Sequence, residues 1–209
     1  EKRNQMKKGQ CPVRRILHRM ERRLYGKRGP AFWAGPEAVG EVVHMMKGLD
    51  VSVHNGTIDW KKVRDSGLQF ALIRAGYGKE LNQKDARFDA NMTGALAAGM
   101  KTGAYWFSYA LNPEEAREEA RVCLQVLAPY KGKMTLPVFY DFEYATEAYA
   151  QRYGYTFTKA QRTEIILAFM QEISKVHPAG YYTNRDYLMY RLETAPLDAW
   201  SLWLADYQN

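Results

Sequence analysis

From residue 47 onward, short apolar runs typical of buried strands alternate with longer segments in which apolar residues recur at helical spacing. We expect strands at 48–53, 70–75, 102–110, 136–143, 180–183 and 201–207. We expect helices at 59–66, 84–98, 113–127, 159–177 and 185–192. Because strands and helices alternate, the pattern predicts βαβ units and a parallel sheet.

The helix starts carry clear capping signals. Thr158 and Gln161 have the spacing of a capping box, and Asn112 followed by Pro113 predicts an N-cap with proline in the first turn. None of the six expected strands is followed by a Gly-x-Gly-x-x-Gly turn, which disfavours a dinucleotide-binding sheet. The predicted fold is therefore α/β, an irregular TIM-like β/α barrel.

Acidic residues stand at the ends of three expected strands: Asp50 on the first, Asp141 and Glu143 on the fourth, and Asp206 on the sixth. Barrel enzymes place their chemistry at the carboxyl ends of the strands. Residues at i and i+2 of a strand share one face, so the two carboxyl groups of the fourth strand repel, which raises one pKa and leaves the other group ionised. Glycoside hydrolysis needs one acid and one carboxylate. The plainer alternative is that both acids are solvated or paired with Lys or Arg.

The charge is unevenly distributed along the 209 residues. Residues 1–47 hold 12 Lys and Arg against 4 Asp and Glu, whereas the rest of the chain holds 18 against 19. We therefore expect a basic, partly helical extension at 1–46, with helices near 12–25 and 36–46, followed by one globular domain at 47–209. Such a basic amphipathic arm binds an anionic surface or an assembly partner, or it is a solvated linker; nucleic acid is not required.

Cofactor, metal and membrane signals are weak. The four histidines are scattered and the two cysteines, Cys11 and Cys123, lie far apart in unlike contexts, so neither a metal site, a cofactor nor a disulfide is expected. No apolar run is long enough to cross a bilayer, and the first residues lack the apolar core of a secretory signal.

Several motifs, taken in order, resemble glycoside hydrolase family 25, the lysozyme-type muramidases. Gly48-Leu-Asp50-Val-Ser52 with Asp59-Trp60 resembles the family's opening signature, and Pro137-Val-Phe-Tyr-Asp141-Phe-Glu143 resembles its Asp-x-Glu strand. Further matching segments are 70–78, 103–110, 180–183 and 202–205. Asp-x-Glu also ends the chitinase signature, but the residues before it here differ from the chitinase pattern.

The resemblance implies cleavage of the β-1,4 bond between N-acetylmuramic acid and N-acetylglucosamine in peptidoglycan, at the bacterial cell wall. It implies Glu143 as the general acid and Asp141 as an ionised group that orients the acetamido group or stabilises charge at the anomeric carbon. Asp50 would support them at the floor of the site, or be a structural acid at a strand end.

Aromatic residues would form the glycan cleft. Tyr105, Tyr109, Tyr140, Tyr182 and Trp203 are expected to face the barrel mouth or its interior. Of these, Tyr109 and Tyr182 are the expected sugar contacts and Trp203 a stacking wall, although a buried tyrosine is more often structural. Arg74 ends the second strand and is expected to pair with Asp50 or a neighbouring acid.

The chain departs from the family pattern at both ends. The family continues past the sixth strand to a Val-Asp-Leu-Asn segment with a further carboxylate, so the barrel is expected to be C-terminally incomplete. The extension and the missing secretory signal fit a phage lysin (endolysin) or a particle-borne lysozyme. The alternatives are a non-catalytic, lysozyme-like component of a phage tail or similar assembly, and a glycosidase for another N-acetylated polymer such as chitin.

Overall fold

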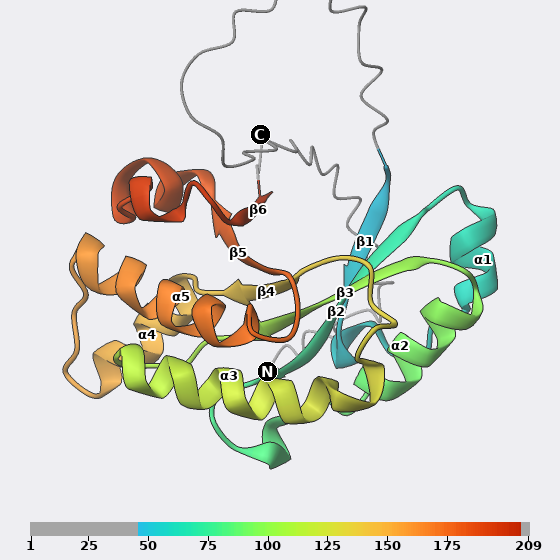
Figure 1. Ribbon diagram of the computed structural model, residues 1–209, viewed down its shortest axis with the longest axis horizontal. Coiled ribbons are helices and arrows are strands. Elements are labelled where there is room, and N and C mark those ends of the chain that lie inside the picture. Colours follow the sequence, from blue (N-terminus) through green and yellow to red (C-terminus); the bar gives the residue numbers. More distant parts are fainter. Residues whose placement is uncertain (1–45, 206–209) are drawn as a thin grey trace, which may run out of the picture.

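A computed structural model of the chain describes residues 46–205, and within them six strands form a single parallel sheet in the order β1 to β6. The sheet curls into a half-barrel with helices on its outer side (Figure 1). This confirms the predicted α/β class and the parallel strands. The strands are β1 (Gly48–Val51), β2 (Phe70–Tyr77), β3 (Lys101–Phe107), β4 (Val138–Asp141), β5 (Ala179–Asn184) and β6 (Ser201–Ala205).

The main helices begin where the capping signals predict. Asn112 Oδ1 accepts the Glu115 N–H at 3.0 Å, and Thr158 and Gln161 form the expected reciprocal capping box. The α-helices are α1 (Trp60–Asp65), α2 (Phe88–Ala97), α3 (Pro113–Leu127), α4 (Tyr144–Arg152) and α5 (Lys159–Ile173). A π-helical turn covers Tyr187–Arg191, and short 3-10 turns cover Val53–Asn55, Leu81–Gln83, Ala128–Tyr130 and Ala195–Leu197.

The main difference from the predicted elements follows the fourth strand. That strand ends at Asp141, and Glu143 is the N-cap of α4, a helix that the sequence pattern did not predict. The chain leaves the sheet here because the backbone N–H of Glu143 donates to the Thr146 hydroxyl at 3.3 Å and not to the backbone of a neighbouring strand. Helix α2 likewise begins at Phe88 rather than at Lys84, because the Asp85 carboxylate accepts the Arg87 N–H at 2.9 Å and holds a turn.

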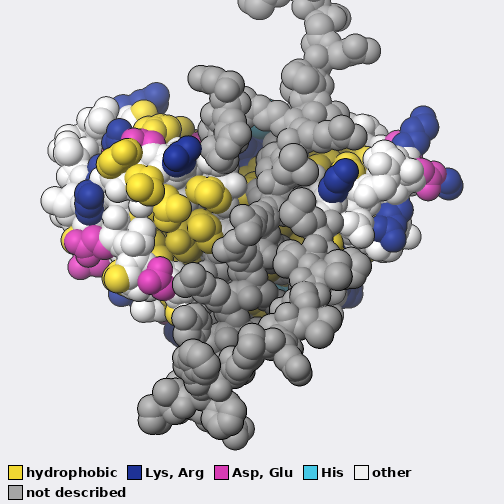
Figure 2. Space-filling model, turned by 90° about the horizontal axis from the view of Figure 1, so that it is seen from above, with side chains coloured by type: hydrophobic (Ala, Val, Ile, Leu, Met, Phe, Trp, Pro, Cys, Tyr) yellow, Lys and Arg dark blue, Asp and Glu magenta, His cyan; other side chains and the backbone are white. Residues whose placement is uncertain are grey.

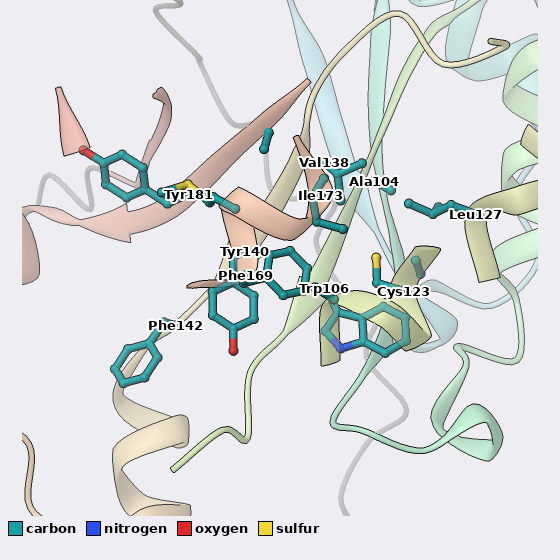
Figure 3. Close-up of a cluster of buried hydrophobic side chains, with 14 of the residues drawn as sticks. Ala104, Trp106, Cys123, Leu127, Val138, Tyr140, Phe142, Phe169, Ile173 and Tyr181 are labelled. Atoms are coloured by element: carbon teal, nitrogen blue, oxygen red, sulfur yellow. The ribbon is translucent and has the colours of Figure 1, made fainter. Parts of the chain in front are cut away.

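Alternate residues of β2, β3, β4 and β5 enter two separate hydrophobic clusters, one on each face of the sheet. The outer cluster packs against the helices. Figure 3 shows it around Trp106 of β3, Tyr140 of β4 and Phe169 of α5. The inner cluster consists of Phe70, Leu72, Tyr105, Leu136, Phe139, Tyr182 and Trp203. Asp50, Arg74 and Asp141 each lie between residues of the outer cluster in sequence, so strand alternation places them on the inner face.

Glycines allow the inner face to close tightly. A Cβ atom on Gly103 would lie 2.7 Å from the Pro137 carbonyl oxygen, and one on Gly180 would lie 2.5 Å from the Ser201 carbonyl oxygen. Both contacts are with backbone, which cannot rotate away. The inner face is therefore packed by a few large rings and aliphatic side chains, with polar groups left to its rim.

Some predictions fall on residues that the structure does not describe. These are the extension up to residue 45, with its two expected helices, and Asp206. In the described part, no helix is both long and apolar enough to cross a membrane. Seen from the side on which β1 and β6 lie in Figure 1, hydrophobic side chains gather on one flank of the molecule (Figure 2).

Candidate active site

The two carboxyl groups singled out by their spacing lie at one strand end but in different local structures. Asp141 is the last residue of β4, and Glu143 begins α4. Asp141 is 9% exposed, whereas Glu143 is only half-buried. The pair therefore combines a deep carboxyl group with a shallower one.

The environment of Asp141 disfavours its charged form. Burial raises the pKa of Asp141 well above its usual range, and the charges of Glu143 and Asp50 raise it further, while Arg74 opposes them. Its Oδ1 atom has no hydrogen-bond partner among the residues that the structure describes. Such an oxygen is costly to bury unless it is used by a ligand.

Glu143 shares this tendency more weakly, since burial raises its pKa as well. The sequence-based expectation was that one carboxyl group of the pair holds a proton and the other stays ionised. Both pKa values move upward in the folded chain, so the pair titrates as a unit and holds a proton to higher pH than isolated carboxyl groups do. Which oxygen carries that proton during a reaction stays a prediction.

Arg74 pairs with an acid that the sequence analysis did not single out. Its Nε atom lies 2.7 Å from Oδ2 of Asp85, whose side chain is fully buried. The Asp85 carboxylate also accepts the backbone N–H groups of Val53 at 3.0 Å and Arg87 at 2.9 Å. The ion pair thus joins the loops that follow β1 and β2, and it fixes a positive charge near Asp141.

A cleft of about 440 Å³ opens beside this ion pair. It lies at the carboxyl ends of β1, β2 and β3, and neither Asp141 nor Glu143 is among its lining residues. Tyr109 lines it, as predicted for a sugar contact, but that role is not tested by the geometry alone. The lining residues are Val53, His54, Arg74, Tyr77, Lys84, Asp85, Ala86, Phe107 and Tyr109.

Three of the predicted aromatic residues pack together on the inner face. Trp203 contacts the rings of Tyr105 and Tyr182 edge-on, with centroids 5.5 and 4.9 Å apart. Tyr182 is in register with both Asp141 and Trp203, so these rings flank the deep carboxyl group. Burial raises the pKa of Tyr105, as do the charges of Asp50 and Asp141. Tyr105 therefore stays a neutral hydroxyl.

The prediction that Tyr140 faces the barrel interior is wrong. Strand alternation places Phe139 and Asp141 on the inner face, and Tyr140 points to the helices. Its ring stacks on Phe169 with centroids 4.0 Å apart (Figure 3).

A buried acid that the sequence analysis missed organises the loops around the site. Glu119 of α3 is 1% exposed; its Oε2 atom accepts the Tyr140 hydroxyl at 2.7 Å, and Oε1 accepts the Tyr109 N–H at 2.8 Å. Tyr140 also bonds the Ser108 hydroxyl at 2.7 Å, and the Ser108 carbonyl accepts the Thr146 hydroxyl at 2.9 Å. Burial raises the pKa of Glu119 to about 8. One network therefore fixes the ends of β3 and β4 and the first turn of α4.

A second network holds α4 in place from the other side. Arg162 of α5 donates to both carboxylate oxygens of Glu147, at 2.7 and 3.1 Å, and the Tyr187 hydroxyl donates to Glu147 at 2.6 Å. A bidentate arginine pair of this kind defines orientation as well as distance. Helix α4, which follows Glu143, is therefore anchored to α5 and to the π-helical turn.

Among the described residues, no three His, Cys, Asp or Glu side chains are placed to hold a metal ion.

Comparisons with known proteins find related sequences and folds. A family model described as "Glycosyl hydrolases family 25" matches residues 49–209. Lysozyme M1 of Streptomyces globisporus is 46% identical over 63 residues, which are 30% of this chain and 21% of that protein. The autolytic lysozyme of Clostridium acetobutylicum is 33% identical over 73 residues, 35% of this chain and 22% of that protein. The matched segments thus span about a fifth of these relatives.

Solved structures show the same fold. The modular autolysin LytC from Streptococcus pneumoniae superposes with a TM-score of 0.66 at 26% identity, over 77% of this chain and 37% of that one. The CTP1L endolysin gives a TM-score of 0.62 at 25% identity, over 77% of this chain and 52% of that one. A family 25 glycosyl hydrolase from Bacillus anthracis, 24% identical with a TM-score of 0.62 over 76% of this chain and 69% of that one, shares the fold.

Proposed function

The chain belongs to glycoside hydrolase family 25, and we propose that it is a peptidoglycan hydrolase. It cleaves the β-1,4 bond between N-acetylmuramic acid and N-acetylglucosamine. The observation that carries this proposal is the carboxyl pair Asp141 and Glu143, which is partly desolvated at the carboxyl end of β4, with Asp50 nearby on the same face. Glycoside hydrolysis requires one carboxylic acid and one carboxylate, and this pair of carboxyl groups can supply both.

Glu143 is the proposed general acid. It is the shallower group of the pair, its pKa is raised by burial, and its position at the start of α4 leaves it within reach of a bound chain. A carboxyl group whose pKa is raised keeps its proton to higher pH and can transfer it to the glycosidic oxygen as the bond breaks. Proton transfer of this kind typically contributes about 10²- to 10⁴-fold to the rate.

Asp141 is the proposed stabiliser of the reacting sugar. A proton on Glu143 removes its repulsion of Asp141, and Arg74 opposes the remaining influence of burial and Asp50, so we propose that Asp141 ionises where it faces the anomeric carbon or accepts the acetamido N–H. Its buried Oδ1 atom supports this role, because it has no partner within the described part of the chain. Asp50 adds negative charge on the same face. This role serves either a route through the substrate's own acetamido group or a route through an enzyme carboxylate.

The glycan is proposed to enter the cleft beside Tyr109, with Arg74 fixed by Asp85 in the cleft wall. Tyr105, Tyr182 and Trp203 support the deep end of the site, and Asp206 is a further proposed substrate contact outside the described residues. The proposed place of action is the bacterial cell wall. Residues 1–46 are proposed as an arm for an anionic surface or an assembly partner.

The direct test uses purified chain and purified peptidoglycan. We expect loss of turbidity and the appearance of new reducing ends. Mass spectrometry of the products should identify N-acetylmuramic acid at each new reducing end. Glu143→Gln should lower the rate by on the order of 10²- to 10⁴-fold while leaving the melting temperature within a few degrees.

The matched control is Glu164→Gln, which makes the same change at an exposed position of α5 and should leave the rate unchanged. Intact peptidoglycan after incubation with the wild-type chain would reject the proposal. Binding to peptidoglycan without any cleavage would instead indicate the non-catalytic, structural role. Faster hydrolysis of chitin oligomers than of peptidoglycan would assign a different N-acetylated polymer as substrate.

A further inference from the structure

Tyr149 of α4 and Tyr153, the C-cap residue of that helix, continue the aromatic lining of the cleft. Tyr149 and Tyr153 are four residues apart and therefore lie on one face of the helix, with ring centroids 5.0 Å apart. Tyr149 in turn contacts Tyr109 at 4.7 Å, and Tyr109 lines the cleft. We call Tyr109, Tyr149 and Tyr153 the tyrosine ridge. It is a continuous row of rings that leads from the cleft along α4.

The ridge is not part of the hydrophobic core. Tyr153 is 60% exposed, and Tyr109 and Tyr149 are only half-buried, whereas Tyr140 and Tyr187 are fully buried. The neighbouring Tyr153 hydroxyl, together with burial, raises the pKa of Tyr149. Tyr109 also packs against Phe107, but the ring of Tyr153 stays largely in water, so burial does not explain its position beside Tyr149.

The direction of the ridge relates it to the proposed acid. Glu143 is the N-cap of the same helix. At about 1.5 Å of rise per residue, Tyr149 lies roughly 9 Å and Tyr153 roughly 15 Å along the helix from Glu143. A chain whose linkage is cleaved at Glu143 and which follows the ridge would therefore contact Tyr149 and Tyr153 with sugars beyond the cleaved bond.

The chemistry of the ridge suits the sugar rings of a ligand. Lys79, which interacts with Tyr149, forms an ion pair with Glu115 at 2.9 Å, so its charge is balanced. Tyrosine rings offer apolar faces to the C–H groups of a pyranose and hydroxyl groups to its polar edge. This chemistry matches the pyranose rings of the wall polymer better than its charged stem peptides.

We propose that the tyrosine ridge is a secondary glycan-binding site, which holds the unreacted part of a β-1,4-linked N-acetylhexosamine chain while the bond at Glu143 is cleaved. The site rests on the proposed function for the identity of its ligand. Its effect is on chain length: a short oligosaccharide fills the cleft alone, whereas a long strand also reaches Tyr149 and Tyr153.

The test measures binding in the absence of cleavage. The probes are peptide-free peptidoglycan glycan strands, separated into tetrasaccharides and strands of more than ten sugars, titrated calorimetrically into Glu143→Gln protein. Adding Tyr153→Ala should raise the Kd of long strands about three- to tenfold and leave that of tetrasaccharides unchanged. Tyr153→Trp, which keeps an aromatic face, should restore long-strand binding.

Tyr190→Ala is the matched control, because Tyr190 is 68% exposed and lies on the π-helical turn, outside the ridge. An unchanged Kd for long strands in Tyr153→Ala would overturn the site, as would an equal loss for both probes. If the wild-type chain cleaves no peptidoglycan but Tyr153→Ala still weakens long-strand binding, the ridge stands and the hydrolase proposal fails. If cleavage is observed and long-strand binding is insensitive to Tyr153, the hydrolase proposal stands and the ridge proposal fails.

Discussion

Glu119 and Tyr140 are joined by a 2.7 Å hydrogen bond on the helix side of the sheet, directly behind the strand that ends in Asp141. Tyr140 precedes Asp141 in the chain, and the other oxygen of Glu119 holds the backbone of Tyr109. The positions of a proposed reacting group and of a cleft residue therefore both depend on one buried carboxyl group, which lies on the opposite face of the sheet.

This buried acid predicts a specific pH dependence of stability. The folded-state pKa of Glu119 is about 8, against an unfolded value of about 4.5. Between these two pH values Glu119 is protonated in the folded chain but ionised in the unfolded chain. Its contribution to the free energy of unfolding is therefore full below about pH 4.5 and is lost as the pH rises toward 8. Glu119→Gln should reduce this decline by on the order of a few kcal/mol, measured by urea denaturation at pH 5, 6.5 and 8.

The Gln side chain can keep the acceptor for the Tyr109 N–H, and its amide can donate to the Tyr140 oxygen. Part of the slope should remain, because burial also raises the pKa values of Asp141 and Glu143. Glu118→Gln, at the neighbouring, more exposed position of α3, is the control and should leave the slope unchanged. An equal decline of the unfolding free energy with pH in wild type and Glu119→Gln would contradict the raised pKa of Glu119.

Asp141 should reduce stability while serving activity. Because burial and neighbouring negative charges raise its pKa, its ionised form is unfavourable in the folded state. Asp141→Asn should therefore raise the free energy of unfolding at pH 8, by about 1 to 3 kcal/mol, and less at pH 5, while hydrolysis of peptidoglycan is lost. Thermal melts at the two pH values test this. Asp198→Asn, at an exposed position, should change neither property.

The pH profile of hydrolysis should be displaced upward. A proton must be present on the carboxyl pair for bond cleavage, and the pKa values of both groups are raised. Activity should therefore persist above the usual pKa of a glutamic acid, about 4.3, and fall as the pH rises through the raised value. The measurement is kcat/KM for glycan strands from pH 4 to 9. An alkaline limb at an ordinary carboxyl pKa would show that the coupling is absent in the working enzyme.

The pair Arg74 and Asp85 should matter far more for stability than a surface pair of equal length. Its N–O distance of 2.7 Å equals that of Lys61 and Asp65, but the Asp85 side chain is fully buried, whereas those of Lys61 and Asp65 are 85% and 59% exposed. Arg74→Met leaves a buried carboxylate without its cation and should cost about 3 to 5 kcal/mol in urea denaturation. Lys61→Met should cost less than about 1 kcal/mol. Similar losses would mean that burial does not distinguish the pairs.

Much of the fold was predictable because its signals are local. Strand runs, caps and alternation act within a few residues, and the predicted parallel strands and the capping box at Thr158 are confirmed. Helix α4 was missed because it begins immediately after the strand, with no glycine or proline between Asp141 and Tyr144 to mark a boundary. An apolar run that continues into a helix is hard to divide by pattern alone.

The site was predictable in part. The acid pair was found by its spacing, but the partner of Arg74 was not, because Asp85 is brought to it by a loop whose path depends on tertiary contacts. Glu119 did carry a signal. It lies between Ala116 and Cys123 on the buried stripe of α3, where a charged residue is rare unless it is bonded. Asp206 and the role of Trp203 stay predictions.

The placement of Glu143 as the N-cap of α4 has a consequence for the moment after bond cleavage. An acid that has given up its proton is left with a negative charge, and here that charge lies at the end of a helix where the free amide hydrogens create a positive potential. The helix thus favours the deprotonated form of Glu143, while desolvation favours the protonated form. A balance between these two influences lets the same side chain release a proton and regain it in every turnover.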